Sequence, residues 1–129
     1  MILKSYFQSL LEFIEICPII ENVDIIRHDY HINESEEILL YRLKVDFSNR
    51  SSLEIFERII CFNNISERTK YSYHWQNSNN ELLGRWDNAP HHPEISTHPH
   101  HHHSPGQTVE SSELSGIEIL EHIVNLLDV

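Results

Sequence analysis

The chain reads Tyr71-Ser72-Tyr73-His74-Trp75-Gln76 and then, after a polar turn at 77–80, Leu82-Leu83-Gly84-Arg85-Trp86-Asp87. Aromatic or apolar residues alternate with polar ones in both stretches, which is the period of a β-strand with one buried face. We therefore expect the two stretches to pair as a β-hairpin. The turn residues predict that Gln76 faces Glu81.

This pairing assigns every side chain of the hairpin to a face of the sheet. Tyr71 would then face Trp86, and the aromatic side would pack against the core. The opposite face would present polar side chains in which Ser72 faces Arg85 and Lys70 faces Asp87. The expected polar set is Lys70, Ser72, His74, Arg85 and Asp87. A slip of one residue would move these side chains to the other face.

Strand and helix patterns extend outward from the hairpin. Alternating or apolar stretches at 23–32, 38–47 and 53–62 predict three more antiparallel strands. Apolar residues recur at helical spacing from 2 to 14, and Pro18 ends that pattern. A second helix is expected to begin at a capping box, Ser115 to Glu118, and to run to about Leu127. The predicted fold class is α+β, a five-stranded antiparallel meander flanked by an N-terminal and a C-terminal helix on one face.

Between the hairpin and the last helix lies a segment rich in histidine. Residues 85–104 contain seven of the eleven histidines in the chain and show no apolar periodicity. We therefore expect a long loop here. Loops carried by rigid strands are common places for catalytic and binding residues.

Length and charge limit the classes of function. A chain of 129 residues and 15.3 kDa is expected to form one domain over residues 1–129. Twenty acidic and nine basic side chains give a formal net charge of -11, so the overall field does not attract a phosphate backbone. Contact with nucleic acid would have to be local. A basic protein partner suits this charge better.

The sequence shows neither an export signal nor a membrane segment. Its apolar runs are far shorter than the roughly 18 to 20 residues of a membrane span, and the first residues lack the pattern of a signal peptide. Cys17 and Cys61 stand far apart in apolar surroundings, as buried thiols do in a reducing compartment. We expect a cytoplasmic protein that does not enter membranes.

Three motifs resemble those of the TumE family of toxins from type II toxin-antitoxin systems. They are the stretches 71–76 and 82–94 and the block His98-Pro99-His100-His101. The resemblance extends from Tyr71 to about Leu127. It implies a toxin encoded beside an antitoxin with a helix-turn-helix DNA-binding domain, and an endoribonuclease action on RNA. Family members tend to carry Lys where this chain has His102, a change that removes a fixed positive charge.

The hairpin and the His-rich segment supply candidate residues for a hydrolase that uses neither a metal ion nor another cofactor. RNA cleavage needs a base for the 2′-hydroxyl proton, an acid for the leaving 5′-oxygen and a cation for the charge on phosphorus. His92 and His101 are the predicted acid and base. Arg85 is the predicted phosphate clamp, and Asp87 would orient a histidine. The reserve histidines are His91, His74 and His98, and the predicted substrate-binding residues are Lys70, Ser72 and His74.

Other readings stay open at this point. Arg85 and Asp87 could form a simple surface ion pair. The imidazoles could instead bind Zn²⁺, Ni²⁺ or Cu²⁺, with ligands drawn from His91, His92, His98, His100 and His101. A third reading is a non-catalytic protein that only binds its antitoxin. A homodimer also agrees with the sequence.

Overall fold

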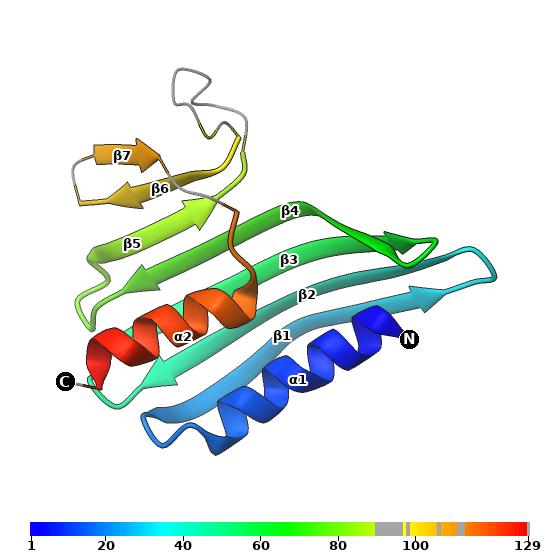
Figure 1. Cartoon of the computed structure of the whole chain (residues 1–129). Helices are drawn as coiled ribbons and strands as arrows, with labels where there is room; N and C mark the ends of the chain where they lie inside the picture. Colours follow the sequence, from blue (N-terminus) through cyan, green and yellow to red (C-terminus); the bar gives the residue numbers. More distant parts are fainter. Residues whose placement is uncertain (90–96, 98, 106, 111–112, 129) are drawn as a thin grey trace.

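The computed structural model describes residues 1–89, 97, 99–105, 107–110 and 113–128. Within these residues the chain forms two helices and seven strands (Figure 1). In chain order they are α1 (Ile2–Ile16), β1 (Ile20–Ile32), β2 (Glu36–Phe47), β3 (Ser52–Phe62), β4 (Ile65–Gln76), β5 (Leu82–Asp87), β6 (His101–Ser104), β7 (Gln107–Glu110) and α2 (Gly116–Leu127). Neither helix is long and apolar enough to cross a membrane.

All seven described strands belong to one antiparallel sheet in the order β1 to β7. Both helices lie on the same face of it (Figure 1), which confirms the predicted α+β fold. The five expected strands are β1 to β5. The two further strands come from the region between the hairpin and the last helix.

The prediction of a loop is wrong for residues 101–104. These residues pair with β5, with Asp87 opposite His101 and Arg85 opposite His103. Strand β5 would otherwise leave its outer backbone groups unpaired, and an edge of this kind readily accepts another strand. Periodicity did not reveal β6 because both of its faces carry the same residue type.

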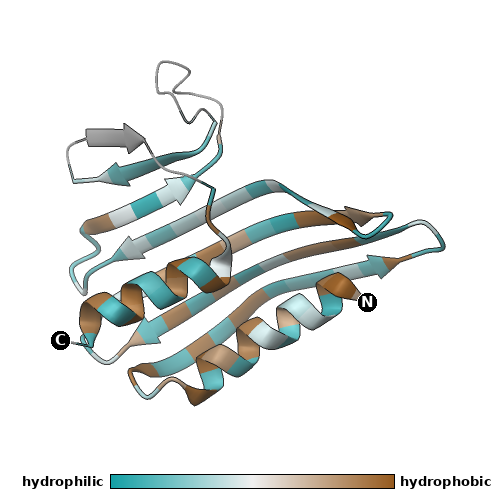
Figure 2. Cartoon of the chain, in the orientation of Figure 1, coloured by the Kyte–Doolittle hydropathy of each residue, from teal (hydrophilic) through white to brown (hydrophobic). Residues whose placement is uncertain are grey.

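The core lies between the sheet and the helices. Along β2 and β3, buried residues alternate with partly exposed ones, and the bands of brown and teal in Figure 2 show the same alternation. The buried side includes Leu43, Ile55 and Tyr73. Helix α1 adds Phe7 and Leu10 to it, and α2 covers the rest with its own apolar side. The opposite face of the sheet carries the polar members of the alternation.

A carboxylate lies inside this core. The side chain of Glu57 on β3 is fully buried. It accepts hydrogen bonds from the Tyr6 hydroxyl of α1 (2.6 Å), from the Tyr73 hydroxyl (2.9 Å) and from the backbone N–H of Gly116 at the start of α2 (3.3 Å). Tyr41 and Arg68 also donate to it. Glu57 thus connects the sheet to both helices.

Glycine is required where α2 meets this carboxylate. A Cβ atom at Gly116 would lie 2.7 Å from the Tyr41 hydroxyl and 2.9 Å from Glu57 Oε1. The absence of a side chain lets the positive end of the helix dipole approach the carboxylate. Burial, together with the neighbouring Glu57, raises the pKa of the Tyr41 and Tyr73 hydroxyls, so both keep the proton that they donate.

A second carboxylate holds the start of α1. Glu37 accepts hydrogen bonds from the N–H groups of Ile2 (3.1 Å) and Leu3 (3.2 Å) and from the Tyr30 hydroxyl (2.8 Å). Burial by itself raises the pKa of Glu37, but these three hydrogen bonds outweigh that effect. The pKa therefore lies below its usual value of 4.5.

We expect Glu57→Ala to lower the free energy of unfolding by about 3 to 5 kcal/mol, because the largely buried charge of Arg68 loses its close partner and keeps only the 3.4 Å contact with the exposed Glu113. Urea denaturation measures the change. The matched control is Glu54→Ala on the same strand, whose partner Arg42 is more exposed; its loss should stay below about 1 kcal/mol. Equal losses in the two variants would show that Glu57 does not hold the helices.

Glu37→Gln should be less stable than the parent by an amount that depends on pH. The folded-state pKa is depressed, so the ionised carboxylate stabilises the fold above pH 4.5, and this contribution disappears as pH falls through the folded-state value. Denaturation at about pH 7 and about pH 3 compares the two proteins on either side of the usual carboxyl pKa. A stability gap that stays constant between these conditions would contradict the assignment.

Candidate functional site

The hairpin that carries the expected polar residues has a different register from the predicted one. Ser72 lies opposite Asp87, Tyr73 opposite Trp86 and His74 opposite Arg85. The predicted pairs are therefore wrong: Ser72 with Arg85, Lys70 with Asp87, Tyr71 with Trp86 and Gln76 with Glu81.

Two local features cause the difference in register. The turn closes through Asn77 N–H and Glu81 O (3.0 Å), with Asn80 in the left-handed region at φ 62°. An irregularity between Trp75 and Gln76 then shifts the pairing once more. The total shift is two residues, and side chains repeat every two residues, so each residue keeps its predicted face.

A groove lies on the face of the sheet opposite the helices. Its volume is about 440 Å³, within the roughly 300 to 1,000 Å³ of typical ligand pockets. The predicted substrate-binding residues Lys70, Ser72 and His74 line it beside Arg85. The other lining residues are Arg42, Glu54, Phe56 and Gln76. The structure thus brings four of the five residues of the predicted polar set, all except Asp87, together in one concave surface.

Asp87 is the centre of a cluster next to this groove. The Asp87 side chain is 4 % exposed, and its carboxylate accepts the N–H of Ala89 at 3.0 Å. Arg85 Nε donates to its Oδ2 at 3.1 Å. Nε2 of His101 lies 2.8 Å from Oδ1, and Nε2 of His103 lies 3.5 Å from Oδ2. One carboxylate therefore contacts a guanidinium and two imidazoles.

Strand β6 explains why these two imidazoles meet at Asp87. Residues two apart on a strand share a face, so His101 and His103 point toward the Asp87 side. Their rings lie 4.7 Å apart, edge to face. Sequence reasoning assigned no role to His103, although the spacing of two in a His-x-His pattern would have indicated one if a strand had been expected.

His102 points to the helix side instead. Its ring stacks on Trp86 with centroids 4.3 Å apart. Gly84 makes room for this stack, because a Cβ there would lie 2.7 Å from the Trp86 ring. Burial, and the nearby His122 of α2, lower the pKa of His102. His102 thus packs β6 onto the core and does not replace a phosphate-binding lysine in the groove.

The ring nitrogens of two histidines have defined neighbours. His101 Nδ1 lies 2.8 Å from the Pro99 carbonyl, which only accepts, so Nδ1 carries a hydrogen. His74 Nδ1 lies 3.4 Å from Arg85 Nη1, which only donates, and Nε2 lies 3.1 Å from Gln76 Oε1. Nδ1 of His74 thus faces a donor and its Nε2 faces an acceptor.

His100 is not part of the cluster. Its ring is parallel to that of Tyr71 at 5.7 Å, and its Nδ1 is 2.9 Å from the Tyr71 hydroxyl, on the helix side of the sheet. The predicted site residues His91, His92 and His98 lie outside the described residues. Of the two predicted metal ligands that the structure describes, His100 and His101, only His101 joins a compact group. That group is Asp87, His101 and His103, with ligand atoms within 4.8 Å of one another.

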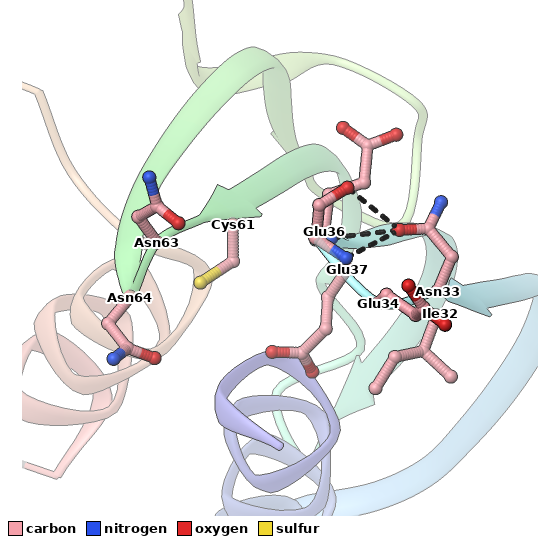
Figure 3. A pocket seen from close by; sticks show the side chains of 9 residues that line it. Ile32, Asn33, Glu34, Glu36, Glu37, Cys61, Asn63 and Asn64 are labelled. Carbon is pink, nitrogen blue, oxygen red and sulfur yellow. Dashed lines mark hydrogen bonds between the residues drawn. The ribbon is translucent and has the colours of Figure 1, made fainter.

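Another hollow, of about 290 Å³, lies at the end of the sheet where the β1–β2 turn approaches the end of β3 (Figure 3). Its polar groups serve the fold. Asn33 Oδ1 accepts the backbone N–H groups of Ser35 and Glu36, both at 3.0 Å, and Glu37 binds the start of α1. Its charged lining residues are Glu34, Glu36 and Glu37, which repel phosphate groups.

The comparisons with known proteins agree with the motifs on β4 and β5. The family model described as Toxin TumE matches residues 10–128, which is nearly the whole chain. No curated protein and no solved structure matches it. Because the family model covers the end of α1, the whole sheet, the Asp87 cluster and α2, the chain belongs to the TumE toxin family.

Proposed function

We propose that this toxin is an endoribonuclease that acts without a metal ion at Arg85, Asp87 and the histidines beside them. Membership of the TumE family makes the chain a toxin of a toxin-antitoxin system. The observation that carries the proposal is the guanidinium of Arg85, 3.1 Å from a buried carboxylate that also contacts two imidazoles. Groups of this kind are able to bind a phosphate and transfer protons next to it.

Arg85 is the proposed phosphate clamp. Its side chain is 40 % exposed and lines the groove, while Asp87 engages only its Nε atom. The guanidinium keeps further N–H groups for a phosphodiester, and these donors stabilise the negative charge that develops on phosphorus when the 2′-hydroxyl attacks. Asp87 fixes the plane of the guanidinium before substrate arrives.

The histidines differ in access to the substrate. The His103 side chain is 21 % exposed, whereas that of His101 is 1 % exposed. We assign proton exchange with the RNA to His103, and we assign to His101 the positioning of Asp87. His74 lies on the other side of Arg85 and would accept the proton of the attacking 2′-hydroxyl, while His103 would donate a proton to the leaving 5′-oxygen. The roles predicted for His91, His92 and His98 stay predictions.

A metal ion bound by Asp87, His101 and His103 is the second candidate. Two imidazole nitrogens and one carboxylate oxygen within 4.8 Å form a donor set that suits Zn²⁺ and similar ions. The Pro99 carbonyl would orient His101, as carbonyl groups commonly do for histidine ligands. Such an ion would supply Lewis-acid chemistry at the same phosphate.

The proposed partner is an antitoxin with a helix-turn-helix domain, and the proposed place of action is the cytoplasm. A formal net charge of -11 favours association with a basic protein. Two alternatives are compatible with the same fold: a non-catalytic toxin that only binds its antitoxin, and a toxin that acts as a homodimer. We propose that one domain carries the activity.

Arg85→Ala and His103→Ala should each reduce RNA cleavage by purified toxin at least about 100-fold, because they remove charge stabilisation and proton transfer, respectively. Toxicity during expression should fall in parallel. The matched control is Arg27→Ala, which removes an exposed arginine paired with Asp29 on β1 and should leave both measurements unchanged. If both site variants cleave RNA and arrest growth as the parent does, the catalytic site lies elsewhere.

Dialysis against a chelator separates the two chemical candidates. We expect cleavage of RNA to be unchanged after removal of divalent ions, since the proposed site uses only side chains. Loss of cleavage that one equivalent of a single ion restores would establish the metal site instead. In that case His101→Ala should abolish stoichiometric binding of the ion, measured by calorimetry.

A further inference from the structure

Phe56 occupies an unusual place for a large apolar side chain. It lies on β3 on the face opposite the helices, where it lines the groove and belongs to no part of the core. Its strand neighbours Ile55 and Glu57 point into the core, so the alternation of the strand turns Phe56 outward. The described helices do not cover this face (Figure 1).

A single row across the sheet connects Phe56 to the proposed reaction centre. In the pairing of neighbouring strands, Phe56 lies opposite Ser72, Ser72 opposite Asp87 and Asp87 opposite His101. Adjacent strands are about 4.8 Å apart, so Phe56 is separated from Asp87 by about 10 Å along the row. Side chains directly opposite one another share a face, so the row is one continuous surface.

Two cationic side chains lie next to the Phe56 ring. Arg42 Cζ lies 4.8 Å from the Phe56 ring centroid, and Lys70 Nζ lies 5.9 Å from it. Glu54 accepts a hydrogen bond from Arg42 Nη1 at 2.6 Å and so holds the guanidinium against the ring. The more distant ammonium of Lys70 belongs to a flexible side chain and is free to move toward a phosphate.

The groove has the opposite charge balance to the chain as a whole. Among the described residues that line it, Arg42, Lys70 and Arg85 are cations and Glu54 is the one carboxylate. The chain carries a formal net charge of -11. Phosphate groups are therefore attracted to this groove by a local field, while the rest of the molecule repels them.

We infer that this groove is a binding subsite for single-stranded RNA in which one unpaired base stacks on Phe56 and Arg42. The subsite rests on the proposed function for the identity of its ligand. Because the Arg42 guanidinium lies over the Phe56 ring, the base stacks on the outer side of the guanidinium and forms one stack with both groups, which are usual partners of unstacked bases. Lys70 binds the phosphate next to this base. The RNA backbone then passes over Ser72, so that the following phosphate reaches Arg85. Base-paired RNA does not fit, because its bases are stacked on one another.

The test measures binding separately from cleavage. The probe is a short, fluorescently labelled single-stranded RNA with 2′-O-methyl groups, which lacks the attacking hydroxyl, and anisotropy gives its Kd. Phe56→Leu keeps most of the side-chain volume but removes the aromatic face. We expect it to weaken binding about 5- to 100-fold, the range that loss of one stacked base produces. Phe56→Trp should bind at least as tightly as the parent.

The matched control is Phe62→Ala, on the same strand and the same face at its far end, where the side chain is 52 % exposed. Its Kd should equal that of the parent. Urea denaturation of all variants confirms that the fold is intact. An abasic version of the probe should bind the parent and Phe56→Leu equally, because the base that distinguishes them is gone.

The outcomes separate the subsite from the proposed function. A parent that does not bind the probe, a Phe56→Leu variant with unchanged Kd, or a loss that persists on the abasic probe each overturns the subsite. If the parent nevertheless cleaves unmodified RNA, the proposed endoribonuclease activity still holds. Tight binding through Phe56 without cleavage of any RNA supports the subsite and overturns the endoribonuclease.

Discussion

The structure depends on the burial of one carboxylate between a sheet and two helices. Glu57 has no exposure to solvent, and its oxygens accept hydrogen bonds from Tyr6 of α1, from the N–H of Gly116 of α2 and from Arg68, Tyr41 and Tyr73 of the sheet. Detaching either helix would take a donor away from a charge buried in an apolar core, which is far more costly than the loss of a donor at the surface. The two helices are therefore held on the same face of the sheet.

This one-sided arrangement determines where function is able to reside. With both helices committed to the core face, the opposite face of β2 to β5 presents its alternate residues to the groove. Strands are stiff supports, and side chains opposite one another in the ladder keep their spacing. The row from Phe56 through Ser72 to Asp87 is thus a consequence of the register of the sheet. A loop would not hold three such groups in line.

The Asp87 cluster is made complete by the pairing of β6 with β5. Asp87 is buried, yet it accepts from Arg85 on its own strand and lies beside His101 and His103 of the next. His102, between them, stacks on Trp86 and anchors the strand from the other side. His101 and His103 thus face Asp87 while His102 packs on the core, because successive side chains of a strand point to opposite faces. One carboxylate thus contacts both the guanidinium of Arg85, the proposed phosphate clamp, and the two imidazoles.

The alternation in residues 71–76 and 82–87 determined much of this protein by itself: the hairpin, its aromatic core side, and the polar side that carries Lys70, His74, Arg85 and Asp87. The capping box at Ser115 likewise determined where α2 begins, because its hydrogen bonds are local. Only the tertiary structure decided that Ser72 faces Asp87, since a turn and a strand irregularity set that register without altering the pattern of the sequence. Only the tertiary structure, too, paired His101 and His103 with β5 and placed Phe56 and Arg42 on the same face of the sheet, beyond β5 and β4. These choices depend on contacts between residues far apart in the chain, and a run of identical histidines contains no periodicity from which such contacts are predicted.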